Sequence, residues 1–435
     1  MKTVRIGAGA GFAGDRIDPA VDLARDGRLK YLVFECLAER TIALAQLAKR
    51  QGSSSGFDPL LRTRMEAVLP FCRSNRTRII TNMGAANPQG AVRETILLAR
   101  SLGLFGLCVA WVTGDDVLHL LPGHTSGDPR EELVSANAYL GIEPIRECLR
   151  KGADVVITGR VADPSLFLAP MVHEFGWSLD DWQRLGQGTA VGHLLECAGQ
   201  LTGGYFADPG YKDVAGLDRL GFPIAEIDES GAAILTKLIG SGGALSVRNC
   251  KEQILYEVQD PSRYLTPDVT ADFTTIQFAQ DGPNKVLVSG AGGSERPTSL
   301  KVSTGFHTGF VAEGQISYAG PGALPRARLA RQILENRLHW IAVGALRMDF
   351  IGIDSMHGAM LSQLACEPYE VRLRAAGRFV EKCDAHRLTQ EIESLYVNGP
   401  AGGGGAVTSV RENIAMDAVL IPRRSVAPEI GLEVA

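Results

Sequence analysis

Several kinds of segment are missing from this chain of 435 residues. It has no C-x-x-C pair, no block of Lys or Arg on one predicted face, and no apolar run long enough to cross a membrane. A net charge of −5 also argues against nucleic acid as a partner. The first residues lack the continuous apolar stretch of a signal peptide. We therefore expect a soluble, cytoplasmic protein that binds neither nucleic acid nor a membrane.

Cysteines are dispersed along the chain, which is typical of free, buried thiols in a reducing compartment. They are Cys36, Cys72, Cys108, Cys148, Cys197, Cys250, Cys366 and Cys383.

Two common catalytic signatures lack the sequence context that they need. No G-x-S-x-G motif and no catalytic cysteine signature occurs between a predicted strand and a predicted helix, so nucleophilic hydrolysis has little support. The glycine cluster at residues 399–405 is not followed by Gly-Lys-Ser/Thr, which argues against nucleoside triphosphate binding.

The length of the chain exceeds the size at which one hydrophobic core usually stops growing, so we expect two domains. Residues 1–214 alternate short apolar runs with helical patterns, which is typical of βα units around a parallel sheet. Asp18, Asp58 and Asp163 each precede a proline, and this pair is typical of a helix start. The expected strands are residues 4–6, 31–34, 78–81, 107–112 and 154–158, and helices are expected at 41–50, 58–71, 89–101 and 144–151.

Residues 215–435 have a different pattern, with β-branched and alternating segments that predict an α+β domain. Strands are expected at 269–278, 285–289, 300–303 and 309–318, and a helix at 325–338. The predicted fold class is therefore α/β: an N-terminal parallel sheet with βα units, followed by an α+β C-terminal domain.

Polar residues follow the expected parallel strands at the points where the strands end. They are Glu35, Asn82, Asn87, Asp115, Asp116, Arg160 and Asp163. Turn and cap roles could explain each of them separately, and Asp163 already serves as a helix start. However, ligands of such sheets bind beyond the carboxyl ends of the strands, and separate structural roles would not need one shared edge. We therefore predict a site there.

A glycine-rich segment at residues 7–14 follows the first strand. Gly9, Gly11 and Gly14 satisfy G-x-G-x-x-G, and Glu35 lies about 20 residues further on, as in a dinucleotide-binding unit. The better helix start is at Asp18, however, so we expect a loop of about ten residues over the sheet edge. Such a loop can bind an anion through its N–H groups or simply turn the chain.

Metal-binding patterns are incomplete. His193, Glu196 and Cys197 could share one helix face, but no second pair completes a zinc site, and a histidine beside a buried cysteine is the simpler interpretation. Asp115 and Asp116, with nearby histidines, could suit magnesium or manganese but are also ordinary loop residues. The sequence decides neither a metal nor a nucleotide cofactor.

Five motifs together resemble the acyclic terpene utilisation AtuA family over nearly the whole chain. They are RIGAGAGFAGDR at residues 5–16, FECLAERT at 34–41, NMGAANP at 82–88, TGRVAD at 158–163 and GPAGGG at 399–404. The resemblance implies a bacterial-type catabolic protein of branched acyl or carboxylate breakdown. It also implies that a small partner protein accompanies some members.

We therefore expect a cytoplasmic lyase- or hydratase-like enzyme that acts on a carboxylate or acyl-CoA-type substrate by proton abstraction or hydration/elimination. Glu35 would move the proton. The substrate would be held by Gly9, Gly11, Gly14, Asn82, Asn87 and Arg160. Two alternatives stay open: an NAD-dependent oxidoreductase that uses the glycines with Glu35, and a noncatalytic subunit of a complex with a small partner protein. We also expect a homo-oligomer.

Overall fold

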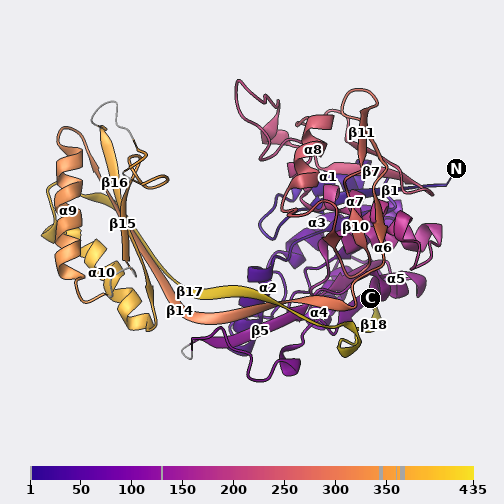
Figure 1. The fold of residues 1–435 in the computed structure, drawn as a ribbon, viewed down its shortest axis with the longest axis horizontal. Coiled ribbons are helices and arrows are strands. Elements are labelled where there is room, and N and C mark those ends of the chain that lie inside the picture. The colour runs from indigo at the N-terminus through magenta and orange to yellow at the C-terminus, as the bar shows by residue number, and fades with distance from the viewer. Residues whose placement is uncertain (1, 129–130, 342–345, 359, 363–367) are drawn as a thin grey trace. The chain divides into compact units, whose positions relative to one another are not determined.

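The computed structural model describes residues 2–128, 131–341, 346–358, 360–362 and 368–435. The chain forms two compact units (Figure 1). Unit 1 consists of Met1–Gly123, Val134–Gly305 and Met416–Ala435, and unit 2 of His124–Leu133 and Phe306–Ala415. These bounds differ from 1–214 and 215–435, because strands from the second half of the chain join the sheet of unit 1.

Unit 1 is built on a sheet with five adjacent parallel strands. In spatial order these are β1 (Thr3–Ala10), β2 (Tyr31–Phe34), β3 (Arg78–Thr81), β6 (Val155–Thr158) and β4 (Cys108–Thr113). All five lie at the expected positions, so the predicted N-terminal parallel sheet is confirmed. Most of their side chains are buried, as expected for a sheet that is covered on both faces.

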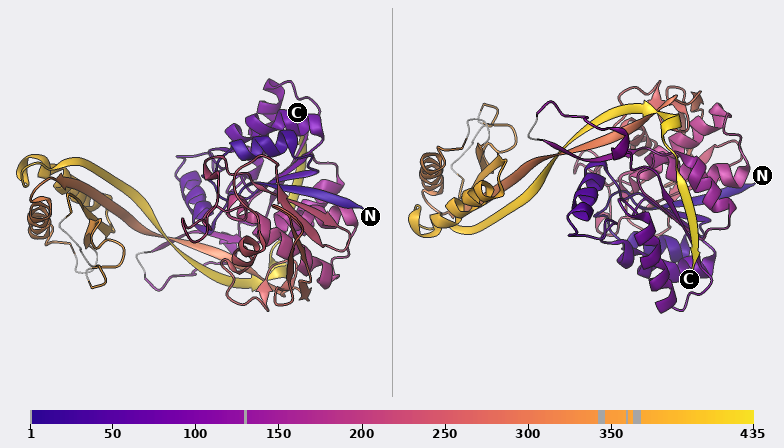
Figure 2. Two further views of the ribbon diagram at one scale, coloured as in Figure 1. Left: turned by 90° about the horizontal axis from the view of Figure 1, so that it is seen from above. Right: turned by 90° about the horizontal axis from the view of Figure 1, so that it is seen from below.

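Antiparallel strands extend this sheet at both edges. Beyond β1 follow β7 (Pro223–Asp228), β8 (Ala233–Lys237), β12 (Val286–Ser289) and β11 (Gln277–Gln280). The C-terminal strand β18 (Glu429–Val434) pairs with β4 at the other edge, and Figure 2 shows it in yellow. A small separate sheet contains β13 (Gly292–Ser294), β10 (Thr270–Asp272) and β9 (Tyr264–Leu265).

Helices follow the parallel strands near the predicted helical patterns and helix starts. They are α1 (Asp18–Asp26), α2 (Glu39–Arg50), α3 (Leu61–Asn75), α4 (Pro88–Ser101), α5 (Ile142–Arg150) and α6 (Asp163–Phe175). Two more helices, α7 (Trp182–Glu196) after α6 and α8 (Val247–Leu255) after β8, complete unit 1. Two of the expected Asp-Pro starts, at α1 and α6, coincide with the first residue of the helix. Asp58 lies before α3 instead, where its carboxylate accepts a hydrogen bond from the Leu60 amide at 2.7 Å.

The glycine segment differs from the expected ten-residue loop. Strand β1 continues to Ala10, so Gly7 and Gly9 lie inside the sheet, and the connection to α1 starts at Gly11. The strand tolerates these glycines because bulky neighbours fill the space above them. A Cβ on Gly9 would lie 2.6 Å from the ring of Phe34.

Three of the strands predicted in the second half have different bounds in the structure. The run at 269–278 is divided into β10 and β11 by a turn in which Asp272 accepts a hydrogen bond from the Thr274 amide. Conversely, the runs at 300–303 and 309–318 form one strand, β14 (Ser299–Ala319). Gly309 adopts φ +91° within it, a conformation that glycine tolerates better than other residues.

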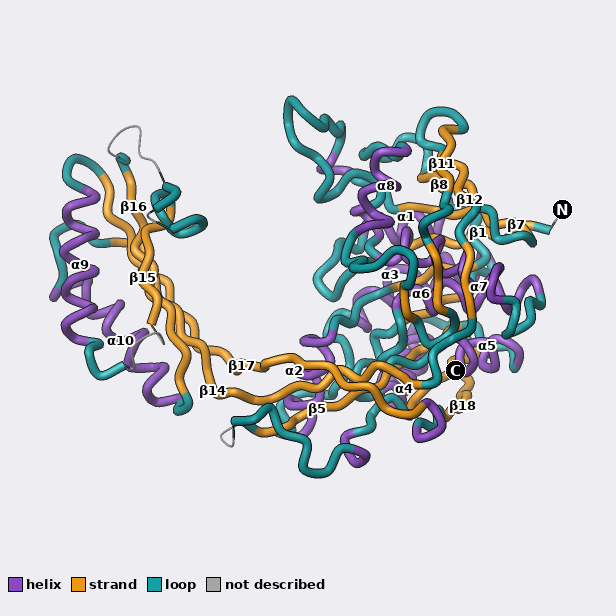
Figure 3. The backbone as a smooth tube through the Cα atoms, in the orientation of Figure 1, coloured by secondary structure: helices purple, strands orange, loops and turns teal. Residues whose placement is uncertain are grey.

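Unit 2 is an α+β layer. Its sheet has the order β15 (Leu346–Ile351), β16 (Glu370–Phe379), β14 and β17 (Gly404–Pro422). Helices α9 (Ala323–Arg337) and α10 (Lys382–Asn398) lie on one side of it (Figure 3). Val371, Leu373 and Ala375 alternate along β16 toward the helices and form the core with Leu334 and Ile392.

The remaining elements are short, apart from β5 (Glu132–Ala138), which pairs with β14. The 3-10 helices are η1 (Leu118–Leu120), η2 (Ala198–Gln200), η3 (Leu217–Arg219) and η4 (Arg423–Ser425). Within the described ranges, no helix is long and apolar enough to span a bilayer.

The cysteines of the described part of the chain are free thiols. Most are buried or half-buried, but Cys383 is exposed, so the expectation of buried thiols does not hold for it. Cys366 lies outside the described residues.

Candidate functional site

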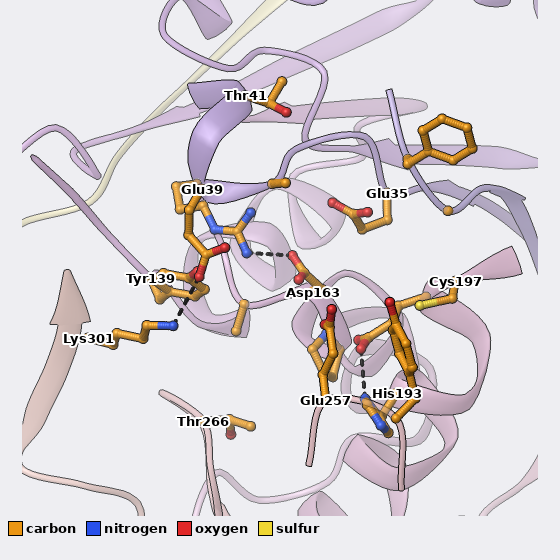
Figure 4. A pocket seen from close by; sticks show the side chains of 18 of the residues that line it. Glu35, Glu39, Thr41, Tyr139, Asp163, His193, Cys197, Glu257, Thr266 and Lys301 are labelled. Carbon is orange, nitrogen blue, oxygen red and sulfur yellow. Dashed lines mark hydrogen bonds and ion pairs between the residues drawn. The ribbon is translucent and has the colours of Figure 1, made fainter. Parts of the chain in front are cut away.

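A cavity of about 1070 Å³ opens in unit 1 beyond the carboxyl ends of the parallel strands. The segments after β1, β2 and β6 contribute Gly11, Glu35 and Arg160 to its lining. Helix α7 contributes His193 and Glu196. This is the edge of the sheet at which the sequence predicts a site, and Figure 4 shows several of the side chains that line the cavity.

Glu35 is held by hydrogen bonds that fix the orientation of the Asn82 side-chain amide. The Asn82 side-chain oxygen accepts from the Cys36 amide at 2.7 Å, so its nitrogen must donate to Glu35 Oε1, at 2.9 Å. The Leu37 amide donates to the same oxygen at 2.8 Å. Among the described residues, no hydrogen bond is made to Oε2. A proton on this carboxyl group therefore belongs on Oε2, since Oε1 is occupied by two donors.

Burial raises the pKa of Glu35 to about 8, with a further contribution from the negative charge of Asp163, while Arg160 opposes the shift. Glu35 is thus mostly a neutral carboxylic acid at pH 7. Cys36, the next residue, is also fully buried, and burial raises the pKa of its thiol well above the usual value. A reactive thiolate at Cys36 is therefore disfavoured.

Arg160 is a buried cation in the cavity wall, with 1% of its surface exposed. Its backbone amide donates to Asp115 at 2.9 Å, and its Nη2 donates to Asp163 at 2.8 Å. The guanidinium lies over the ring of Tyr139, 4.2 Å from the ring centre. Its Nε and Nη1 are buried without a hydrogen-bond partner among the described residues. The cation therefore has donors available for an anion.

A second charged cluster lies on the same wall. The Tyr139 hydroxyl donates to Glu39 at 2.5 Å, and the Lys301 ammonium donates to the same oxygen at 3.0 Å. Burial opposes ionisation of Glu39, but these two hydrogen bonds outweigh it and lower its pKa to about 2. Glu35 and Glu39 therefore line one cavity in opposite protonation states.

Helix α7 supplies a buried His-Glu pair. Glu196 Oε1 lies 2.7 Å from His193 Nδ1, and both residues are more than nine-tenths buried. The His193 ring packs between Tyr264 and Phe273, at 5.3 and 5.8 Å between ring centres. Burial raises the pKa of Glu196 to about 7, and the neighbouring His193 counteracts this shift.

The other predicted binding residues have different positions. Asn82 orients Glu35 rather than lining the cavity, and Asn87 caps α4 by accepting from the Gly90 amide at 3.1 Å. Gly9 lies within β1, and Gly14 lies outside the cavity lining. Gly11 does line the cavity, but its N–H donates to the Asp15 carboxylate at 2.8 Å. The Asp15 carboxylate thus takes the place at the Gly11 amide that was predicted for an anionic ligand.

The suspected metal ligands do not assemble. Asp115 accepts hydrogen bonds from Arg160 and Asn137, and Asp116 accepts one from Gln46. Within the residues that the structure describes, no group of three or more His, Cys, Asp or Glu side chains is arranged to hold a metal ion.

A family model described as "Acyclic terpene utilisation family protein AtuA" matches residues 4–432. The chain belongs to this family. The sequence resemblance is thereby confirmed over nearly the whole chain, and it connects the protein with the catabolism of acyclic terpenes. No curated protein and no solved structure matches it.

Sequence reasoning missed part of the cavity of this AtuA family member. Glu39, Tyr139, Lys301 and Glu257 were not singled out, although Glu39 lies within one of the family motifs. Figure 4 shows Glu35, Asp163 and Glu257 around one space, with His193 beside it. Tyr139 and Lys301 come from distant segments without a motif, so no local signal could have identified them.

Proposed function

We propose that the chain is a catabolic enzyme that acts on a carboxylate or acyl-CoA-type substrate by proton abstraction or hydration/elimination, and that it works in the cytoplasm. The supporting observation is Glu35, a buried carboxyl group with a raised pKa and one oxygen without an internal partner. Perturbed acids in a cavity are typical of proton-transfer sites. With a pKa of about 8, Glu35 serves as the proton donor in the resting enzyme.

Arg160 supplies the complementary charge. Its two unpartnered nitrogens suit a carboxylate or the enolate oxygen that develops when a proton leaves the carbon next to a thioester carbonyl. Because Tyr139 and Asp163 already hold the guanidinium, little reorganisation is needed when the charge appears. This is the arrangement that stabilises a transition state better than a ground state.

The remaining walls fit a branched acyl chain. Apolar side chains gather in the lining, including Phe12, Leu220, Phe222, Leu300 and Leu420. Ligand cavities for small molecules measure roughly 300–1,000 Å³, so about 1070 Å³ accommodates such a chain with its head group. A substrate from acyclic terpene catabolism would have this combination of an apolar, branched chain and an acyl head.

The glycine segment gives less support to the oxidoreductase alternative. A dinucleotide site needs a helix that begins within the glycine motif and points its free N–H groups at the pyrophosphate. Here α1 begins at Asp18, after the motif, and the Gly11 N–H already donates to Asp15. We therefore favour the lyase or hydratase function.

The test uses 3-hydroxy-3-methylbutyryl-coenzyme A as a branched probe and measures loss of water by the absorbance of the conjugated product. Glu35→Gln preserves size but removes the acidic proton, so turnover should fall by about 100-fold with little change in binding. Glu147→Gln, an exposed carboxylate on α5, is the matched control and should retain full turnover. Unchanged turnover in Glu35→Gln would contradict the proposal, as would a saturable rise in melting temperature with millimolar NAD.

A further inference from the structure

Glu196 lines the cavity and has one side-chain oxygen that no hydrogen bond within the described residues uses. Its Oε1 bonds His193, but its Oε2 is buried without a hydrogen-bond partner among the described residues. A buried carboxylate oxygen without a hydrogen-bond partner destabilises the folded protein. The residue lines the cavity from the end of α7 and is 8% exposed. A group kept at this cost beside an open cavity is a candidate for contact with substrate.

His193 is positioned to influence the protonation of the Glu196 carboxyl group. It stands one helical turn before Glu196, and Tyr264 and Phe273 fix the plane of its ring. The contact through Nδ1 at 2.7 Å lets the pair share one proton. The other ring nitrogen, Nε2, is buried without a partner among the described residues. The contact through Nδ1 is thus the one by which the imidazole can influence the protonation of Glu196.

We propose that Glu196 is a second proton-transfer residue of the cavity, positioned by His193, and that it acts as the base while Glu35 acts as the acid. The inference rests on the proposed function and narrows it to hydration/elimination. A reaction that only relocates a proton needs one such group, whereas removal of water needs a base at carbon and an acid at the leaving oxygen.

The step balances with these two groups alone. The Glu196 carboxylate takes the proton from the carbon next to the thioester carbonyl, and the electron pair of that C–H bond passes through the enolate into a new C=C bond. The C–O bond at the neighbouring carbon breaks, its electron pair leaves with oxygen, and the proton on Glu35 Oε2 completes a water molecule. The reverse sequence adds water to the double bond.

The charged neighbours agree with this assignment. Asp163 on α6 and Glu257 after α8 both face the pair, and their negative charges raise the pKa of Glu196 and of His193. Tyr264 from β9 packs against the ring. Burial raises the pKa of both carboxyl groups, to about 8 for Glu35 and to about 7 for Glu196, where the neighbouring His193 opposes the shift. A base and an acid that act together should give a bell-shaped pH dependence of the rate.

The experiment measures two reactions of 3-hydroxy-3-methylbutyryl-coenzyme A separately. One is the exchange of its α-protons with deuterated water, and the other is the release of water. Glu196→Gln should reduce both by about 100-fold, because the base acts first. Glu35→Gln should reduce water release to the same degree but retain exchange within about threefold, because Arg160 still stabilises the enolate. Glu252→Gln, an exposed carboxylate on α8, is the control.

His193→Asn tests the positioning role and serves if Glu196→Gln does not fold. Asparagine can keep a hydrogen bond near the place of Nδ1 but cannot carry a positive charge. Loss of that charge should move the rising limb of the kcat/KM profile to higher pH, because protonated His193 favours the ionised carboxylate. A purely structural histidine would change the rate without moving the limb.

The outcomes distinguish the two proposals. If the wild-type protein shows neither exchange nor water release, the proposed function fails, and the role of Glu196 fails with it. If the wild-type protein is active but Glu196→Gln retains exchange, the inference alone is overturned. Equal loss of both readouts in the two glutamine variants, or an unmoved rising limb in His193→Asn, would also overturn it.

Discussion

Glu35→Gln should make the protein more stable, and increasingly so as the pH rises. The pKa of Glu35 is 4.5 without the fold and about 8 within it. Below pH 4.5 both states carry the proton, so folding is not affected by this group. Above pH 4.5 the unfolded state ionises first, which favours unfolding, and the penalty stops growing above pH 8. Glutamine resembles the neutral acid and removes the penalty.

The magnitude follows from the width of that interval. A pH of 7 is about 2.5 units above the pKa that Glu35 has in the unfolded state. At 1.36 kcal/mol per unit, ionisation of Glu35 therefore favours unfolding by roughly 3 kcal/mol at this pH. At pH 8 and above, the full shift corresponds to roughly 5 kcal/mol. The side-chain oxygen of glutamine can still accept from Leu37 and Asn82, so the internal hydrogen bonds are retained. The gain should therefore be close to zero at pH 4.5.

Urea unfolding at a series of pH values measures this difference. Trp111, Trp177 and Trp182 lie in unit 1 and report on it by fluorescence. Glu39→Gln is the matched control, because the pKa of Glu39 is lowered to about 2 and its charge stabilises the folded state at neutral pH. Relative to the wild type, that variant should lose stability as the pH rises from about 2 to 4.5, and the difference should stay constant above pH 4.5. If the stability difference between Glu35→Gln and the wild type does not change with pH, Glu35 is ionised in the folded protein, and the assignment as acid fails.

Two further predictions concern residues of the strand ends. Asn87→Ala should destabilise the protein by about 1 kcal/mol through loss of the α4 cap, with unchanged turnover per folded molecule; a selective loss of substrate binding would show that Asn87 contacts substrate instead. Gly11→Ala places a Cβ 2.5 Å from the backbone of Cys197, so it should lower the free energy of unfolding by roughly 1–3 kcal/mol and weaken binding in the cavity. Gly404→Ala, where a Cβ meets nothing within 4 Å, is its control, and equal melting temperatures for the two variants would refute the close approach.

Local sequence patterns were sufficient to predict the parallel sheet. The runs at 31–34 and 78–81 coincide with β2 and β3, because short runs rich in apolar and β-branched residues between helical patterns favour the buried centre of a sheet. From that sheet follows the shared edge at which Glu35 and Arg160 meet. The family motifs lie at the same edge, since FECLAERT includes Glu35 and TGRVAD includes Arg160 and Asp163.

The tertiary structure decided what those residues can do. The raised pKa of Glu35 depends on burial and on Asp163, a residue 128 positions away that the sequence explains as a helix start. Glu39 has the same side chain but the opposite shift, because Tyr139 and Lys301 approach it from remote segments. Asn82 and Asn87 look alike in sequence, yet one orients the acid and the other caps a helix. Protonation and hydrogen bonding depend on neighbours in space, and residues this far apart become neighbours only through the packing of the folded chain.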